Sequence, residues 1–268
     1  MSRFPLLTRL ALGFLALLAI AAVGVGFLPF DPNTFNPNLA AIPLPPGFPH
    51  VLGTDDLGRD ILIRLLYGAR VSLSVACIAV VLSLSIGVTV GAASGFFGGW
   101  TDKCLMRFTE LVMAIPGIFL ILVLQSFFKP SLITVVCVIG LTGWMGIARF
   151  ARAEVLSLKE RLFITAARAR GISEFRLMIR HILPLAINPV IVAATLGMSH
   201  AILSESVLSF LGLGVQPPQA SWGNMLENSL AQLYSAPWMV FGPGLFITLT
   251  VLSLTLIGDQ LRTALEGN

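Results

Sequence analysis

Residues 149–184 read RFARAEVLSLKERLFITAARARGISEFRLMIRHILP, the one long polar and basic segment in an otherwise apolar chain of 268 residues. This basic segment holds eight Lys and Arg residues and three Glu residues, which is a net charge of +5. The whole chain carries +4, so the remainder is nearly neutral. A segment of this composition is expected to lie in water beside apolar helices, either as a solvated connector or as a docking surface for a partner.

The centre of the basic segment is predicted to form two short helices joined at a glycine. Residues 156–170 contain no proline or glycine and are rich in strong helix formers. Gly171 is expected to end the first helix in the left-handed conformation. Ser173 can then cap a second helix that carries Glu174 in its first turn, and Pro184 stops that helix or opens the next one.

The composition predicts an all-α, polytopic membrane protein. Hydrophobic residues make up 56% of the chain and charged residues 11%, with a mean hydropathy of +0.90, whereas soluble domains have about 25% charged residues. The apolar runs have the length of membrane-spanning helices and lack the alternation of a transmembrane barrel. The basic residues do not cover a soluble face as in a nucleic-acid-binding domain, so the expected surroundings are a lipid bilayer and no nucleic acid.

Six transmembrane helices are predicted, over residues 10–30, 71–94, 109–128, 131–148, 185–213 and 237–258. The first apolar run is longer than that of a cleaved signal peptide, so it is expected to remain as a span. In the third span, Pro116-Gly117 predicts a kink.

The chain is expected to divide into three parts. Residues 1–70 comprise the first span, an extracytoplasmic loop and an amphipathic helix. Residues 71–263 form the transmembrane core together with the basic segment. Residues 264–268 form a short cytoplasmic tail.

Residues 53–60, GTDDLGRD, follow a proline-rich loop and open the predicted amphipathic helix. Thr54 can cap this helix, with two aspartates in the first turn. Asp60 can pair with Arg64 one turn further on. The helix is expected to lie on the bilayer surface up to Arg70.

Several side chains in the spans have predicted packing roles. Three glycines follow one another at four-residue spacing: Gly87, Gly91 and Gly95. Small residues at this spacing let two helices approach closely in lipid. Three cysteines without C-x-x-C spacing are expected to be buried small hydrophobes: Cys77, Cys104 and Cys137.

Two acidic residues lie in predicted spans, where an ionisable side chain is a functional candidate. Glu110 is close to the start of its span and to Arg107, which favours an interfacial ion pair. Glu205 is expected to face protein or water, because a charge at the bilayer centre is costly. Trp222 and Trp238 are expected at the membrane interface.

The basic segment resembles the EAA loop of ABC-importer membrane subunits, whose pattern is E-A-A-x3-G-x9-I-x-L-P. The matching residues are Thr165, Ala166, Ala167, Gly171, Leu183 and Pro184. Two positions depart from the pattern, since Thr165 replaces Glu and His181 replaces Ile. In that family the loop forms a coupling helix that enters a cleft of the cytoplasmic ATPase subunit, so the resemblance implies the same role here.

Other stretches resemble the peptide, opine and nickel branch of these permeases, in particular the C-type subunits of dipeptide and oligopeptide permeases. The most specific match is the extracytoplasmic motif with Gly53, Thr54, Asp55, Asp56, Gly58, Arg59 and Asp60. Residues 212–226 resemble the loop after the fifth span. The end of the chain resembles a GD-x-L-R-D-x-L tail, with Thr263 in place of the last acid. The resemblance covers nearly the full length and implies the type I permease fold.

The resemblance implies a permease subunit of an ATP-driven ABC importer that forms half of the pathway for peptides, opines or nickel chelates. The implied partners are a homologous second permease, two cytoplasmic ATP-binding subunits and an extracytoplasmic substrate-binding protein. The sequence contains no G-x-x-x-x-G-K-[ST] phosphate loop, so ATP is expected to be used by the partner subunits. The three histidines are scattered, and we predict no catalytic residue, no metal site and no cofactor on this chain.

An ion-coupled secondary transporter is the main alternative from another class, and a scaffold subunit without transport is a third. Secondary transporters commonly carry internal repeats and ion-binding carboxylates within the membrane. We detect no repeat in this sequence, and its candidate carboxylates are Glu110 and Glu205.

The distribution of basic residues predicts the orientation. With six spans and both termini cytoplasmic, 13 of the 17 Lys and Arg residues lie inside, including all eight of the basic segment. The positive-inside rule selects this arrangement over its inverse. The expected location is the bacterial inner membrane, with the EAA-like loop on the side where ATP is.

Overall fold

The computed structural model describes residues 5–27, 31–34 and 43–266, and the regular elements in these ranges are helices, with one isolated bridge between Thr54 and Asp60. The all-α prediction is confirmed. Parts of four sequence-based expectations lie outside the described residues: Arg3, the end of the first span at residues 28–30, residues 35–42 of the proline-rich loop, and the last two residues of the tail.

The long apolar helices are α1 (Leu6–Gly24, continued by a short 3-10 turn, Val25–Phe27), α2 (Ile61–Phe97), α3 (Gly99–Met113), α4 (Gly117–Ser126), α5 (Leu132–Thr142), α6 (Trp144–Lys159), α10 (Ile187–Phe210) and α12 (Trp238–Glu266). The short ones are α7 (Leu162–Ala169), α8 (Glu174–Leu177), a π-helical turn (Met178–Ile182), α9 (Leu183–Leu185), α11 (Trp222–Ser229) and a 3-10 turn (Leu230–Gln232).

In the described part of the chain, five helical segments are long and apolar enough to cross a membrane, with α5 and α6 together forming one of them. The pair α3 and α4 makes a sixth span if it is counted as one bent segment, with an angle of 84° between the two helices. Pro116 lies at this bend, where its ring and missing N–H prevent the helix from continuing. The predicted kink is therefore present, and it is sharp enough to divide the segment into two helices. The stretch left between the predicted spans 71–94 and 109–128 is largely helical, since α2 continues to Phe97 and α3 begins at Gly99.

The predicted amphipathic surface helix is also wrong, because Ile61 to Arg70 form the first turns of the long helix α2. Asp60 is the N-cap of α2, with its carboxylate accepting a hydrogen bond of 3.0 Å from the N–H of Ile63. Ile61 and Leu65 are buried in the core. The expected boundary between residues 70 and 71 therefore falls inside one continuous helix.

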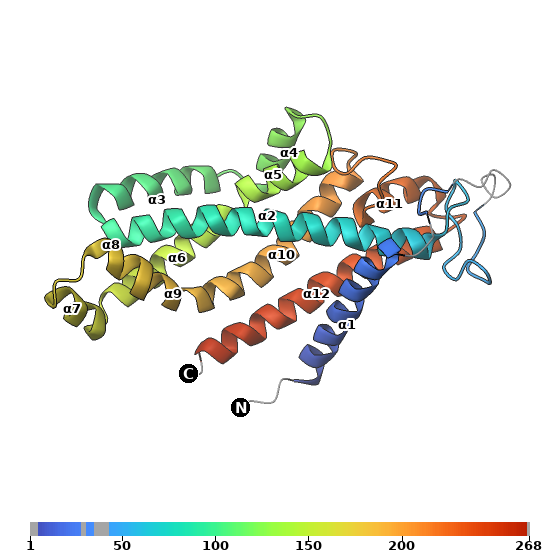
Figure 1. Ribbon diagram of the computed structural model, residues 1–268. Coiled ribbons are helices and arrows are strands. Elements are labelled where there is room, and N and C mark those ends of the chain that lie inside the picture. The colour runs from blue at the N-terminus through green and yellow to red at the C-terminus, as the bar shows by residue number, and fades with distance from the viewer. Residues whose placement is uncertain (1–4, 28–30, 35–42, 267–268) are drawn as a thin grey trace.

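Figure 1 shows α2 running along most of the length of the molecule, with α6, α10 and α5 packed against it. The glycines of α2 make the contact with α6 close. A Cβ atom added at Gly87 would lie 2.7 Å from the side chain of Ile147, and one added at Gly95 would lie 2.9 Å from the carbonyl oxygen of Arg152. At Gly91 the added atom would meet the carbonyl of Ala148. The packing role predicted for the three glycines is confirmed.

The two ends of the bundle differ in structure. One end carries α7 and α8, and the other carries α11 and residues 43–60, which together we name the cap (Figure 1). Helix α12 extends to Glu266, so residues 264–266 belong to it and do not form a separate tail.

Three further predictions concern single side chains. Arg107 and Glu110 form the expected ion pair on α3, at 3.3 Å and exposed. The cysteines are not buried, since Cys77, Cys104 and Cys137 all lie on exposed surfaces of their helices. Trp222 is fully buried rather than at an interface, and its indole N–H donates a hydrogen bond of 3.1 Å to the carbonyl of Leu65.

Candidate functional site: a cleft between the cap and the basic segment

A cleft of about 1080 Å³ opens along the bundle, lined by α2, α4, α5, α6, α10 and α12. Its walls are mainly aliphatic and small residues, such as Val80, Ile121 and Gly197. Glu154 of α6 and Arg262 of α12 line it near the ends of these helices, and His200 lines it from the middle of α10. The cleft is as large as a typical small-molecule site, which is about 300–1,000 Å³.

The basic segment begins in the wall of this cleft, which Phe150 and Glu154 line, and continues beyond one end of it. Its first part continues α6 as far as Lys159, and α7 begins only at Leu162. The single helix predicted over residues 156–170 is therefore wrong, because Arg161 adopts an extended conformation between the two helices. The same helix, α6, thus lines the cleft and leads directly into the basic segment.

The predicted break at Gly171 is confirmed. Gly171 has φ +81°, and its N–H donates a hydrogen bond of 3.0 Å to the carbonyl of Arg168. Ser173 stands at the N-cap of α8, as predicted, but its side chain makes no capping hydrogen bond.

The turn is closed instead by an ion pair between Arg168 and Glu174. The Arg168 guanidinium donates two hydrogen bonds, of 2.6 and 3.1 Å, to the Glu174 carboxylate. These bonds lower the pKa of Glu174 and raise that of Arg168. Both side chains are largely exposed, so the pair helps to shape the loop and adds little to its stability.

A small apolar cluster anchors the basic segment to the bundle. Ile164 and Ile182 are fully buried in one cluster with residues of α2 and α6, including Phe96 and Val155. Leu177 of α8 is also fully buried. Several large apolar side chains of the segment are exposed: Leu162, Phe163, Phe175 and Ile179. The exposed surface of the segment is therefore both apolar and basic.

The residues that match the EAA-like pattern lie on both sides of the turn. Thr165, Ala166, Gly171 and Pro184 are exposed, whereas Ala167 and Leu183 are partly buried. Leu183 packs against the anchoring cluster. Their part in coupling remains a prediction.

Two polar contacts tie α6 to the neighbouring helices next to the basic segment. Arg152 donates two hydrogen bonds of 2.6 Å each to Asp102 at the start of α3. Lys159 donates a hydrogen bond of 2.5 Å to the carbonyl of Phe96 at the end of α2, and its ammonium lies 5.4 Å from the centre of the Phe96 ring. These contacts fasten α6 to α2 and α3.

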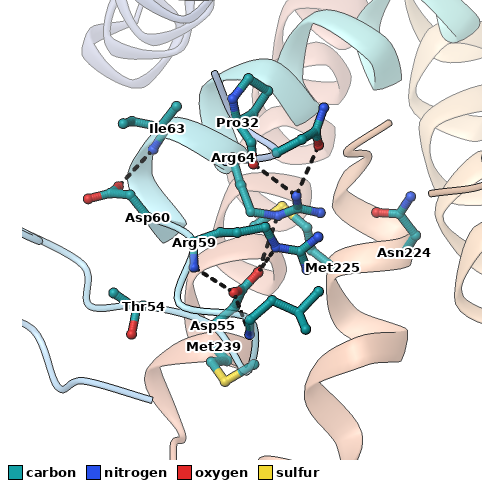
Figure 2. Close-up of polar contacts among 12 residues, drawn as sticks. Pro32, Thr54, Asp55, Arg59, Asp60, Ile63, Arg64, Asn224, Met225 and Met239 are labelled. Atoms are coloured by element: carbon teal, nitrogen blue, oxygen red, sulfur yellow. Dashed lines mark hydrogen bonds and ion pairs between the residues drawn. The ribbon is translucent and has the colours of Figure 1, made fainter. Parts of the chain in front are cut away.

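At the other end, the cap is held by buried charges (Figure 2). The Asp55 carboxylate accepts a hydrogen bond of 2.7 Å from the Arg59 side chain and lies 3.5 Å from the guanidinium of Arg64. Arg64 in turn donates to the carbonyl of Pro32 at 3.1 Å. Asp55 is 6% and Arg64 3% exposed, so neither charge is left to water.

The GTDDLGRD motif thus forms a turn that precedes α2, and two predictions for it are wrong. Thr54 caps no helix; its hydroxyl accepts a hydrogen bond of 2.8 Å from the N–H of Leu44. Asp60 does not pair with Arg64 but lies 2.9 Å from the ring of His50. Gly53 and Gly58 have positive φ, which the turn requires. Burial and the neighbouring Asp55 raise the pKa of Asp56.

Glu205 joins the cap to the bundle. This fully buried carboxylate of α10 accepts hydrogen bonds of 2.9 Å from Ser72 of α2 and 2.7 Å from Ser209. Ser72 also accepts from the N–H of Trp222, at the start of α11, at 3.4 Å. The prediction that Glu205 faces protein is confirmed, and its contacts make it a structural residue of the cap.

Comparison with known proteins identifies the family. Residues 87–267 match the family model described as "Binding-protein-dependent transport system inner membrane component". The chain belongs to this family. The prediction of an ABC-importer permease subunit is therefore confirmed, and the chain is a multi-pass membrane protein.

Individual relatives agree with this assignment. The permease is 41% identical over 229 residues to the oligopeptide transport system permease protein OppC of Bacillus subtilis, a match that covers 85% of this chain and 75% of the relative. It is 43% identical over 221 residues to the dipeptide transport system permease protein DppC of Alkalihalophilus pseudofirmus, covering 82% and 73%.

A solved structure supports the fold. The permease is similar to a chain of the MetNI methionine ABC transporter in an inward-facing conformation, with a TM-score of 0.58 and 20% identity, covering 76% of this chain and 95% of the other. At this identity the similarity supports the type I permease fold that was predicted.

Sequence reasoning missed the parts of the site that lie between helices. In the sequence His200 is one of three scattered histidines, yet it lines the cleft. Arg152 and Lys159 stand out in the sequence only as charges of the basic segment. The sequence carries no signal for these contacts, since their partners are 50 and 63 residues away.

Proposed function

We propose that this permease forms half of the membrane pathway of an ATP-driven importer for peptides in the bacterial inner membrane. The observation that carries the proposal is the cleft of about 1080 Å³, whose mostly aliphatic wall suits a solute with varied side chains. The names of the relatives, dipeptide and oligopeptide permeases, favour peptides over opines or nickel chelates.

The partners in this proposal are a homologous second permease, two cytoplasmic ATP-binding subunits and an extracytoplasmic substrate-binding protein. The second permease completes the pathway. The ATP-binding subunits dock on the exposed face of the basic segment, around Thr165, Ala166 and Gly171, and the binding protein docks over the cap. ATP is bound and hydrolysed by the partners, and this chain supplies neither catalytic residues nor a cofactor.

The mechanism follows from the path of α6. Closure of the ATP-binding subunits moves the basic segment, and Lys159 and Arg152 transmit that movement to α2 and α3. Gly146, Ile147 and Phe150 of the same helix line the cleft, so its wall moves with the segment. The cap is held by buried ion pairs and provides a fixed end against which the cleft opens and closes.

Uptake by the reconstituted complex tests the substrate and the energy source. Proteoliposomes with the permease and its four partner subunits are given labelled trialanine, an opine or a nickel chelate, with ATP inside or outside the vesicles. We expect ATP-dependent uptake of trialanine that persists when ionophores collapse the ion gradients. Uptake that requires an ion gradient and no ATP would establish the secondary-transporter alternative.

Cysteine labelling tests the orientation. In a chain whose Cys77, Cys104 and Cys137 are replaced by serine, a membrane-impermeant maleimide is expected to reach Gly47→Cys and Gln219→Cys on intact cells. It should reach Glu174→Cys only after the membrane is opened. Labelling of the Glu174 position from outside would reverse the proposed topology.

A further inference from the structure

His200 is an ionisable residue in the middle of a membrane-spanning helix. It lies at the midpoint of the apolar segment Val190–Phe210 of α10, and its side chain is exposed and lines the cleft. Ionisable side chains within the membrane are costly, and they mark functional positions unless a structural partner explains them. The other ionisable residue of α10, Glu205, is buried and has such partners in Ser72 and Ser209.

No structural partner explains His200. Among the described residues, its ring makes no hydrogen bond or ion pair, in contrast to His50, which lies 2.9 Å from Asp60 in the cap. The imidazole therefore presents two free nitrogen atoms to the cleft. A neutral imidazole carries one N–H donor and one acceptor nitrogen.

The surroundings of His200 leave its ring accessible. Three of the lining residues next to it on α10 are small, Gly197, Ala201 and Ser204, and the fourth is Leu196. Ser83, which lines the cleft from α2, already donates its hydroxyl hydrogen to the carbonyl of Gly140 at 2.8 Å. Of the described residues that α10 contributes to the cleft, His200 is the one that is both ionisable and able to donate and accept hydrogen bonds.

We propose that His200 is a substrate-contacting residue of the pathway, which hydrogen-bonds the backbone amides of a peptide in transit. This inference rests on the proposed peptide function. A peptide offers an N–H and a C=O at every residue whatever its side chains, and a ring with one donor and one acceptor matches both. A single contact of this kind in an apolar wall binds weakly, and weak sites let a solute enter a pathway and leave it.

Two substitutions separate hydrogen bonding from shape. In the complete complex in proteoliposomes, His200→Leu keeps most of the volume of the ring and removes both polar groups, whereas His200→Gln keeps a donor and an acceptor. Leu203→Ala, on α10 outside the cleft lining, is the matched control.

We expect His200→Leu to reduce ATP-dependent uptake of labelled trialanine about tenfold, which corresponds to one hydrogen bond. His200→Gln and the control should stay within about twofold of the wild type. Assembly, and stimulation of ATP hydrolysis by the loaded binding protein, should be unchanged in all three variants.

Four results would overturn the inference. Wild-type uptake by His200→Leu would show that the ring does not contact the solute, and equal losses in His200→Leu and His200→Gln would show that only shape matters. A His200→Leu chain that no longer co-purifies with its partners would place the ring in a subunit interface. A wild-type complex that transports another solute but not trialanine would refute the peptide function itself, and the peptide contact with it.

Discussion

The cap and the basic segment are both polar, yet they are held in opposite ways. In the cap the charges are inside, with Asp55 and Arg64 almost fully buried and paired. In the basic segment most of the charged side chains are exposed, and the buried contact is a small apolar cluster that includes Ile164 and Ile182. Buried ion pairs demand one geometry, whereas an apolar cluster and a single glycine turn tolerate displacement. The comparison predicts a rigid cap and a segment that can move as a lever.

The largest effect is expected from opening the buried pair of the cap. Asp55→Ala leaves Arg59 and Arg64 without their shared carboxylate in a buried site. Removing one partner of a buried ion pair costs about 3–5 kcal/mol, so the thermal midpoint of the purified permease should fall strongly and less chain should reach the membrane. The matched control is Glu110→Ala, which breaks the exposed pair with Arg107 and should cost at most about 1 kcal/mol. Equal, small effects of both substitutions would mean that the cap is not rigid.

A smaller effect, confined to the loop, is expected at Gly171. Valine at φ +81° is strained by about 1–3 kcal/mol, and no neighbouring atom lies within 4 Å of an added Cβ, so the strain is one of backbone alone. Gly171→Val should reach the membrane at normal levels but lose transport and stimulation of ATP hydrolysis. Gly171→Asn tolerates the left-handed conformation and should retain both. Normal uptake by the valine variant would show that this turn is only a connector.

Next in size is the link between α6 and α2. Lys159→Met keeps the aliphatic stem and removes the hydrogen bond to the carbonyl of Phe96. A loss of about 1–2 kcal/mol is expected from a charged hydrogen bond that is partly exposed. If the link transmits movement, more ATP should be hydrolysed per transported solute, while the thermal midpoint should fall only slightly. A midpoint change with unaltered coupling would assign Lys159 a structural role alone.

The smallest effect is expected for the exposed pair of Arg168 and Glu174. The pKa of Glu174 is lowered from 4.5 by its hydrogen bonds with Arg168. The pair therefore stabilises the loop fully above the unfolded pKa, and this contribution is lost as pH falls through the lower folded value. Glu174→Gln should differ slightly from wild type in thermal midpoint at pH 7, and the difference should shrink as pH falls below 4.5 and vanish below the lowered pKa of the folded state. A difference that grows in acid would contradict this sign.

Much of the fold could be predicted because it depends on local chemistry. The apolar runs predict the spans, Pro116 predicts the break between α3 and α4, and Gly171 predicts the end of α7. Glycines at four-residue spacing predict the close contact of α2. Each of these follows from the residue itself and its neighbours along the chain.

The errors lie where local preference competes with packing. The sequence 54–70 has the pattern of a separate surface helix, but burial of Ile61 and Leu65 makes its helical part the start of α2. The N-cap residue of that helix is Asp60 and not Thr54. Likewise, residues 156–170 favour one helix. In the structure the helix is broken between Leu158 and Ile164, and both side chains are buried in the same apolar cluster.

By itself, the sequence determined that this chain crosses a membrane as helices, that the chain breaks at Pro116 and Gly171, and to which family it belongs, because hydrophobicity, backbone conformation and motif spacing are local properties. Only the tertiary structure decided which polar groups meet. Ser72 and Glu205 are 133 residues apart and Trp222 and Leu65 are 157 apart, and packing of the helices brings each pair within hydrogen-bonding distance. The cleft with His200 in its wall exists only because six helices from distant parts of the chain enclose it.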